Sequence, residues 1–245
     1  MDNLSDMNVL EVYHKGKKII KDEKVEIRPC DPQLKNTVHL LGFRESDLRL
    51  PWREGKVHIL KMMEGQIVTE DVREEVGYTE EKGRKVFKPD GTYQKIAAVE
   101  RHKNTGKIGV GIVKGFGLRG GAIASSVSHD SHNLIVIGDN DHDMYLAVQE
   151  LLRTQGGYTL VENGQVFDTL PLPIMGLMSD AGYEKVNEKL ARMISKAHEM
   201  GIPEGFDPFI TLSFMALPVI PEIRITPRGV YLTQEDRMIQ SPFDR

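Results

Sequence analysis

The stretch VKGFGLRGGAIASSVSHDSHN, residues 113–133, leads from a glycine-rich turn through a run of small residues into a histidine-rich loop. Its glycines permit backbone conformations that other residues avoid. Its last six residues carry two imidazoles, a carboxylate, an amide and two hydroxyls. This is the densest group of chemically active side chains in the sequence. We therefore expect a strand at 122–127 that leads into a candidate functional loop.

Apolar runs separated by turn residues extend from this stretch in both directions and predict further strands. The expected strands are residues 9–14, 17–20, 57–63, 66–72, 95–100, 107–113, 122–127, 134–137, 158–162 and 165–170. Asn163-Gly164, between the last two, is the strongest signal for a two-residue hairpin. Together with two helical segments, these strands predict an α+β fold with mostly antiparallel sheets and two main helices.

The two helical segments are residues 142–153 and 183–200, which both repeat apolar residues at helical spacing. The acids and amide at 139–141 offer N-cap oxygens for the first helix. The apolar tail 209–225 contains prolines, so we expect a buried extended segment near a sheet edge. The segment 70–85 is strongly charged and is expected to form a solvated loop or a mobile excursion.

The composition is that of an ordinary globular protein, with 40% apolar and 28% charged residues. A net charge of −4 gives no general reason to expect nucleic-acid binding. The single Cys30 excludes an internal disulfide and suits a reducing compartment. No run approaches the ~18 apolar residues of a membrane span, and the acidic N-terminus does not resemble a signal peptide. We therefore expect a cytoplasmic protein without membrane attachment.

Gly115, Gly117 and Gly120 match the spacing of a dinucleotide-binding fingerprint. That fingerprint works only when the glycines open a helix whose N-terminus holds a pyrophosphate. Only the expected strand at 122–127 separates them from the polar loop, which leaves no room for a useful helix. A turn required by backbone geometry, or one that lines a ligand or a neighbouring domain, explains these glycines better.

The loop Ser128–Asn133, called the SHDSHN loop below, supports three interpretations. His129, Asp130 and His132 could ligate a metal, since imidazole and carboxylate are common ligands. The same polar groups could instead fix a tight turn through hydrogen bonds. They could also face a ligand or another domain. On a regular strand the two imidazoles would point to opposite sides, so they converge only in a loop.

Arg101 and His102 lie in the polar turn between the strands expected at 95–100 and 107–113. As charges at a strand end they would ordinarily be solvated. The hairpin formed by these two strands leads into the glycine turn, so both side chains are also candidates to face the same region as the SHDSHN loop.

Other metal and catalytic motifs are incomplete or absent from the sequence. Asp139, Asp141 and Asp143 imitate a calcium loop, but Met144 stands where such a loop needs glycine, and helix capping explains the acids better. No His-x-His, Pro-Cys-x-x-Cys or G-x-S-x-G motif occurs. We assign no metal ligand and no catalytic residue within this chain.

Four motifs resemble the C-terminal part of bacterial and archaeal adenine deaminases of the amidohydrolase superfamily. They are residues 113–133, VERHKNTG at 99–106, MGLMSD at 175–180 and DPFITLSFMALPVIPEIRIT at 207–226. The resemblance covers roughly residues 9–226. It implies that residues 1–24 are the remnant of a small β-sandwich, that 25–84 are an irregular wrapping segment with a hairpin, and that 85–245 are the C-terminal α+β domain.

In this family a metal-dependent barrel converts adenine and water to hypoxanthine and ammonia, with manganese or iron as the metal. Nothing in the present sequence matches the barrel ligands, so the resemblance implies a chain that needs a separate barrel domain or subunit and is inactive alone. A separately encoded subunit, a split gene product and a shortened protein all fit. Met1 directly before an expected hairpin favours a natural start. A homo-oligomer is compatible with this reading.

The resemblance also favours a role for the SHDSHN loop at a substrate site or between domains. Its candidates are His129, Asp130, His132, Asn133 and Ser128, followed by Arg101, His102, Gly115 and Gly117. Gly115–Gly121 and the loop would then lie together at the barrel mouth. Two alternatives stay open. The chain could be a stand-alone module that binds a purine or a partner without catalysis, or an independent metalloenzyme that uses His129 and His132.

Overall fold

The computed structural model describes residue 5, residues 9–19 and residues 30–244 of the chain. It divides into two compact units, Met1–Cys30 and Asp31–Arg245. The first unit contains a hairpin of β1 (Val12–His14) and β2 (Lys17–Ile19). Its turn, Lys15-Gly16, has positive φ at both positions, and it joins the two strands that were expected at 9–14 and 17–20. Residues 20–29, which include part of the expected irregular segment, lie outside the described residues.

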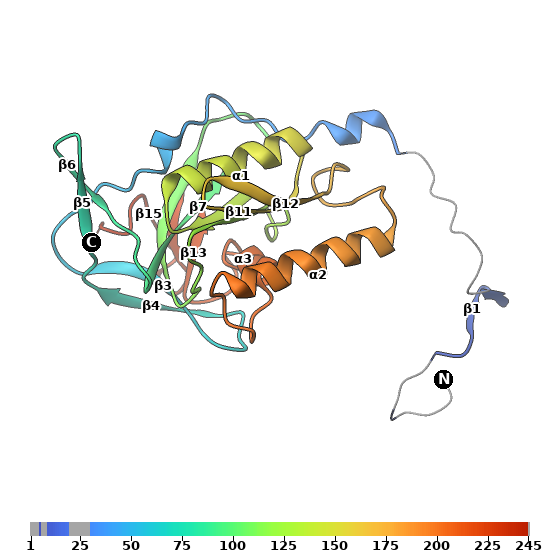
Figure 1. Cartoon of the computed structure of the whole chain (residues 1–245). Coiled ribbons are helices and arrows are strands. Elements are labelled where there is room, and N and C mark those ends of the chain that lie inside the picture. Colours follow the sequence, from blue (N-terminus) through green and yellow to red (C-terminus); the bar gives the residue numbers. More distant parts are fainter. Residues whose placement is uncertain (1–4, 6–8, 20–29, 245) are drawn as a thin grey trace. The chain divides into compact units, whose positions relative to one another are not determined.

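The second unit is built on an eight-stranded sheet with the order β12-β11-β9-β10-β7-β8-β3-β4 (Figure 1). Its strands are β3 (Val57–Met62), β4 (Thr69–Glu74), β7 (Tyr93–Val99), β8 (Ile108–Lys114), β9 (Gly121–Ser125), β10 (Leu134–Gly138), β11 (Gly157–Glu162) and β12 (Gln165–Pro171). Only the pairing of β3 with β8 is parallel. The sheet is therefore mostly antiparallel, as expected.

Three helices and two small sheets complete the unit. The helices are α1 (Asp141–Thr154), α2 (Tyr183–Glu199) and α3 (Pro208–Phe214). The small sheets are β5 (Tyr78–Glu81) with β6 (Arg84–Phe87), and β13 (Ile223–Thr226), β14 (Gly229–Leu232) and β15 (Arg237–Ile239). No helix in the part that the structure describes is long and apolar enough to cross a bilayer.

The central strands of the large sheet are buried on both faces. Along β10, Leu134 and Val136 pack with α1 and the segment 38–50, while Ile135 and Ile137 pack with α2, α3 and the β13–β15 sheet. Successive side chains of a strand point to opposite faces, so an uninterrupted apolar strand needs a cover on each side. In Figure 1, α1 accordingly lies on one side of the sheet and α2 and α3 on the other.

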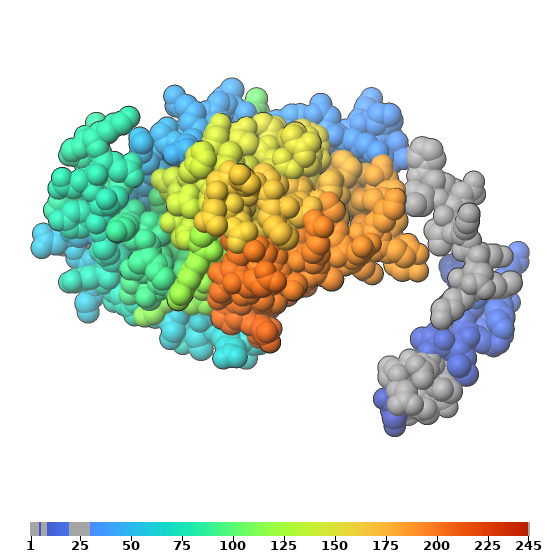
Figure 2. Space-filling view, viewed as in Figure 1, coloured from blue at the N-terminus to red at the C-terminus, as the bar shows by residue number. Residues whose placement is uncertain are grey.

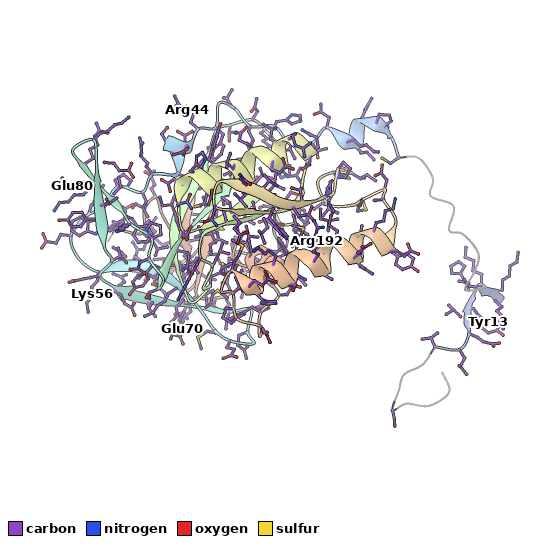
Figure 3. The ribbon with its side chains drawn as sticks, viewed as in Figure 1. Tyr13, Arg44, Lys56, Glu70, Glu80 and Arg192 are labelled. Carbon is purple, nitrogen blue, oxygen red and sulfur yellow. The ribbon has the colours of Figure 1, made fainter. Side chains whose placement is uncertain are left out.

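Local signals explain the two long helices. Asn140 caps α1, because its side-chain oxygen accepts the N–H of Asp143. Met193 and Ala197 are the buried positions of α2, whereas charged side chains such as Arg192 lie on its outer surface (Figure 3). Figure 2 shows α2 and the segment that follows it covering one face of this unit. Both helices were predicted within two residues of their ends.

Two expectations about the fold were wrong. The charged segment 70–85 is not a loop, because β4 and the β5–β6 hairpin use it, and its charged side chains include both exposed ones and Asp71, which pairs with the buried His58. The tail 209–225 is not extended throughout, because α3 occupies 208–214. Asp207 caps α3 with two backbone hydrogen bonds, and Pro208 is its first residue. An acid followed by proline is a helix start signal that the apolar character of the tail obscured.

The boundary that the sequence suggested between residues 84 and 85 runs through the second unit. Strands β3 and β4, from the expected wrapping segment, pair with each other, and β3 pairs with β8, so both belong to the same sheet as β7 to β12. Val38, Leu48 and Leu50 are buried in the core beside α1. We therefore describe residues 31–245 as one body.

The strand β8 requires glycine at position 109. A Cβ atom there would lie 2.0 Å from the Thr226 carbonyl oxygen and 2.7 Å from the Gly229 nitrogen, both backbone atoms. We expect Gly109→Ala to lower the free energy of unfolding by about 1–3 kcal/mol, since backbone cannot yield as a flexible side chain does. Urea unfolding followed by circular dichroism measures this change.

Gly77→Ala is the matched control. A Cβ at Gly77 would have no heavy atom within 4 Å. We expect its effect to stay within about 0.5 kcal/mol. Equal effects of the two substitutions would contradict the close contact at Gly109.

Candidate functional site

The SHDSHN loop connects β9 to β10 at one end of the large sheet. The connection between β7 and β8, residues 100–107, emerges at the same end, because β7 pairs antiparallel with both β8 and β10. The start of β11 lies there too, since Tyr158 is opposite Ser125. The sheet topology thus brings two of the four sequence motifs, the SHDSHN loop and the turn at 99–106, to the same end of the sheet.

Backbone hydrogen bonds hold the SHDSHN loop in a compact turn. The N–H of His132 donates to the Ser128 carbonyl oxygen at 2.6 Å, and His132 itself has φ of 50°. The loop is also tied to the end of α3. The N–H of His129 donates to the Ser213 carbonyl oxygen at 3.2 Å, and the Ser213 hydroxyl donates to the carbonyl of Val127.

The two imidazoles of the loop lie near each other. Their ring centroids are 6.2 Å apart. His129 is stacked on Phe214 with centroids 4.8 Å apart, and 39% of its side chain is exposed. Asp130 is exposed and lies 3.4 Å from the His129 Nδ1 atom. The loop therefore presents one accessible imidazole, held by an aromatic ring, and a more buried one behind it.

Two polar atoms of the loop are buried without a hydrogen-bond partner. They are the Ser128 hydroxyl oxygen and Nδ1 of His132. Burial lowers the pKa of His132, and the positive charge of Arg101 lowers it further, so this imidazole is held in its neutral form. Buried polar atoms of native proteins nearly always have a partner, and an exception calls for an explanation.

Arg101 joins the loop to two distant segments. Its Nε atom donates to the His132 carbonyl, Nη1 donates to the Thr37 carbonyl at 2.8 Å, and Nη2 donates to the Met175 carbonyl at 2.9 Å. The side chain is fully buried, and burial lowers the pKa of its guanidinium to about 10. A Cβ on Gly176 would lie 3.0 Å from this group, so glycine is needed there to admit it.

Hydrogen bonds through His102 and Asn133 join the loop to the neighbouring connection. His102 Nε2 lies 2.7 Å from the Ser131 carbonyl oxygen. Asn133 Oδ1 accepts the backbone N–H of Arg101 at 3.3 Å. Both Arg101 and His102 thus lie beside the SHDSHN loop, while a functional role for either stays a prediction.

Glu100 orders the connection that carries Arg101 and His102. Its carboxylate accepts the backbone N–H groups of residues 102, 103 and 105 and the Thr105 hydroxyl. Burial opposes ionisation of this carboxyl, but the hydrogen bonds outweigh it and lower the pKa of Glu100 to about 2. The turn is therefore fixed by an acceptor that stays ionised at neutral pH.

The glycine turn does not lie with the SHDSHN loop. Gly115 and Gly117 precede β9, whereas the loop follows it, so the five-residue strand separates them by about 17 Å. A Cβ on Gly117 would lie 2.6 Å from the Gly201 carbonyl oxygen, so this turn is glycine-rich because it packs against the end of α2. A strand follows the glycines, which excludes the helix that a dinucleotide fingerprint requires.

The acids at 139–143 stabilise the same far end of the sheet. Asp139 accepts the N–H groups of Gly120 and Gly121. Asp143 accepts the N–H of Gly164 at 2.9 Å, and Asp141 pairs with the buried Lys95. These carboxylates bind the glycine turn, the β11–β12 hairpin and Lys95 of β7, so they hold these elements together at the start of α1.

The SHDSHN loop does not present a metal-ligand set. Residues 9–19 and 30–244 contain no group of three or more His, Cys, Asp or Glu side chains placed to hold a metal ion. The manganese or iron implied by the resemblance therefore does not fit the described donors.

Sequence reasoning did not identify the residues that hold the SHDSHN loop and Arg101 in place. Ser213 and Phe214 belong to α3, which was not predicted. Thr37 lies in an irregular segment without a local signal. The start signal at Asp207-Pro208 could have revealed the first pair, but nothing in the sequence connects Thr37 to Arg101.

We expect Arg101→Met to lower the free energy of unfolding by roughly 3 kcal/mol, because three carbonyls would lose buried donors. Arg101→Lys should recover little of this loss, since lysine lacks the planar fork of donors. Arg73→Met, at an exposed position, is the control and should change stability by less than about 0.5 kcal/mol. Urea unfolding measures the stability of all three variants. An unchanged free energy of unfolding in Arg101→Met would contradict the role of Arg101 in holding the three segments together.

The lowered pKa of His132 predicts a loss of stability in acid. A histidine whose pKa is lower in the folded than in the unfolded protein stabilises the fold fully above its unfolded pKa, near 6.5. That contribution is lost as pH falls through the folded pKa. His132→Asn removes the titrating group and suits the positive φ. We expect thermal unfolding midpoints to fall less between pH 7.5 and 5 in this variant than in the parent; an identical fall would refute the assignment.

Comparison with known proteins places these features in a family. The sequence model described as "Adenine deaminase C-terminal domain" matches residues 66–237. The adenine deaminase of Desulfitobacterium hafniense (strain Y51) is 50% identical over 240 residues, which is 98% of this chain and 42% of that protein. The adenine deaminases of Nitratidesulfovibrio vulgaris (strain DP4) and Clostridium acetobutylicum are 42% and 40% identical, over 94% of this chain and 40% and 41% of theirs.

The chain spans about two fifths of the length of these relatives. The matched domain model covers most of the second unit, including the SHDSHN loop, Arg101, His102 and α3. The chain therefore belongs to the adenine deaminase C-terminal domain family and corresponds to the C-terminal part of longer adenine deaminases.

Proposed function

We propose that this chain is the C-terminal part or subunit of an adenine deaminase, which converts adenine and water to hypoxanthine and ammonia. The support is its membership of the domain family and the name shared by its relatives. The chain covers only two fifths of those proteins, so a companion segment corresponds to the rest. The companion in this proposal is a metal-binding barrel, and the present chain alone does not catalyse the reaction.

The unpartnered atoms of the SHDSHN loop carry the proposal. Ser128 Oγ and His132 Nδ1 lack hydrogen-bond partners in the described part of the chain. A partner supplied by substrate or by the companion would satisfy them. The loop then lies at the mouth of the barrel, where it closes or orders the site and excludes water.

Residues in and beside the loop have different roles in this arrangement. His132 is a neutral imidazole, able to accept or donate a hydrogen bond without adding charge. His129 offers a half-exposed ring fixed by Phe214. Arg101 is a positioning residue, because it holds the loop backbone from behind and is too buried to reach a substrate. Asp130, Asn133 and His102 remain further candidates beside them.

The manganese or iron of the complete enzyme belongs to the companion in this proposal. The described residues offer no suitable ligand set, so none of the roles above depends on a metal in this chain. We also propose cytoplasmic purine salvage and adenine catabolism as the setting, consistent with a single cysteine.

The β1–β2 hairpin is proposed to complete the small β-sandwich of the whole enzyme. The described residues of both strands are exposed, and Val9, Leu10, Val12, Tyr13 and Ile19 are large apolar side chains among residues 9–19. An isolated two-stranded hairpin is marginally stable in water. Additional strands from the companion would bury one of its faces.

A chimera tests the proposed function. This chain replaces the matched region of the D. hafniense adenine deaminase, and ammonia release from adenine is measured with manganese or ferrous iron. We expect the chimera to be active and the isolated chain to be inactive. Activity of the isolated chain would contradict the proposal. Saturable adenine binding by the isolated chain, with an inactive chimera, would favour a stand-alone binding module.

Substitutions in the chimera test the loop. We expect His132→Ala to lower kcat/KM for adenine by about 10- to 100-fold through lost positioning, with Ser128→Ala acting in the same direction. His142→Ala is the control, because its exposed imidazole lies at the far end of the sheet. Unfolding midpoints measured alongside separate loss of structure from loss of function. Unchanged activity in both loop variants would remove the loop from the site.

Metal analysis gives an independent check. We expect the isolated chain, dialysed against manganese or ferrous iron, to retain no stoichiometric metal, while the chimera retains it. His129→Ala with His132→Ala should leave the metal content of the chimera unchanged. Metal retained by the isolated chain and lost in that double variant would favour the alternative of an independent metalloenzyme.

A further inference from the structure

We infer that the outer face of α3 and the turn between β3 and β4 form the surface on which the companion segment docks. This inference rests on the proposed function, because it names where the companion binds. The surface is formed by Met63, Ile67, Val68, Ile210, Phe214 and Val219 and is called the α3 face below.

The helix α3 has two apolar side chains that the core does not use. Phe209 and Leu212 are buried against the large sheet. Ile210 and Phe214, four residues apart, lie together on the opposite side of the helix. Ile210 is 53% exposed, and Phe214 is half-buried. A seven-residue helix with apolar side chains on both sides is expected when a second body covers its outer side.

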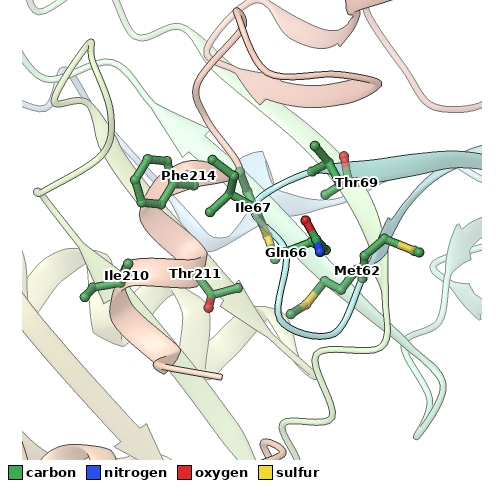
Figure 4. Close-up of a pocket in the computed structure, with 10 residues that line it drawn as sticks. Met62, Gln66, Ile67, Thr69, Ile210, Thr211 and Phe214 are labelled. Carbon is green, nitrogen blue, oxygen red and sulfur yellow. The ribbon is translucent and has the colours of Figure 1, made fainter. Parts of the chain in front are cut away.

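The turn between β3 and β4 faces these side chains. Ile67, which is also 53% exposed, lines a small cleft with Ile210 and Phe214. Figure 4 shows Ile67 and Gln66 on one side of this cleft and Thr211 on the other. The cleft brings together two segments that are more than 140 residues apart, so it is a product of the fold rather than of one apolar run.

The α3 face has few charges. Residues 208–221 and 66–69 contain no Asp, Glu, Lys or Arg. Val219, 77% exposed, extends the apolar surface along the segment that follows α3. Elsewhere on the unit some partly exposed aromatic rings have cations beside them, since Arg192 and Lys196 lie over Phe167 and Lys85 lies over Tyr78. Charge depletion around clustered apolar residues is typical of an interface core.

The α3 face is continuous with the SHDSHN loop. Phe214 is stacked on His129, and Ser213 bonds to the backbone of the same loop. A body that covers the α3 face therefore also lies beside the SHDSHN loop. About three fifths of the length of the relatives lies outside the matched region, which supplies one occupant of suitable size. This continuity favours the companion over a second copy of this chain.

Cysteine labelling in the chimera tests the docking surface. In a Cys30→Ser background, Ile67→Cys and Ile210→Cys are placed separately in the isolated chain and in the chimera, and maleimide labelling is read from the peptide that contains each thiol. We expect labelling at both positions to be at least about tenfold slower in the chimera, because thiol reactivity follows exposure. Val166→Cys, at an exposed position on β12, is the matched control and should react equally in both proteins.

The outcomes separate this inference from the proposed function. An active chimera in which residues 67 and 210 label as fast as in the isolated chain overturns the inference and leaves the proposed function intact. Protection at these positions in an inactive chimera supports the inference and counts against the proposed function. Equal protection at 166 overturns the assignment to the α3 face. Protection already present in a dimeric isolated chain identifies a second copy as the occupant and also overturns it.

A charge substitution gives a second readout that does not depend on labelling. We expect Ile210→Asp to lower the unfolding midpoint of the chimera and to leave that of the isolated chain unchanged. Val166→Asp should change neither. A loss in both proteins would mean that Ile210 supports the domain itself, and no loss in either would contradict docking at this face.

Discussion

Arg101 is a buried cation whose guanidinium donates to three backbone carbonyls and one hydroxyl, and the end of the sheet that carries the candidate site depends on it. A charge taken out of water must recover its hydrogen bonds within the protein. The guanidinium recovers them from the segments around Thr37, His132 and Met175, which are far apart in the sequence. Each of these segments is therefore fixed in place by the need to solvate one side chain.

Different groups hold the loops at the two ends of the large sheet. At the far end, Asp139 and Asp143 bind the backbone of the glycine turn and of the β11–β12 hairpin. At the near end, Ser128 and His132 retain buried polar atoms without partners among the described residues. The near end adjoins the α3 face through the stacking of His129 on Phe214, and this is where we infer that the companion docks.

Much of the fold could be predicted because local signals agree with tertiary structure. Asn140 caps α1, and Asn163-Gly164 forms a two-residue turn with positive φ at both residues. The predictions that were wrong concern segments whose overall composition pointed to one structure while a local signal pointed to another. The apolar run of 208–221 concealed the α3 cap at Asp207, and the charges of 70–85 concealed strands that are solvated on one side.

The candidate site was only partly accessible to the sequence. The many polar side chains of the SHDSHN loop are evident from the sequence itself. The proximity of the loop to the Arg101–His102 turn follows from the antiparallel pairing of neighbouring strands. Gly115 and Gly117 lie at the opposite end of β9 from the SHDSHN loop. Because they are close to the loop in the sequence, we expected them to be close in space as well. The partners of Arg101 and the stacking of Phe214 on His129 join segments that no local pattern connects.

A crystal structure of the chimera with adenine bound tests the central claim most directly. The account predicts that the SHDSHN loop lies at the mouth of the companion's site, with Ser128 Oγ and His132 Nδ1 within hydrogen-bonding distance of adenine, an ordered water or the companion. A structure in which the companion binds elsewhere and these two atoms stay unpartnered and remote from adenine would contradict it.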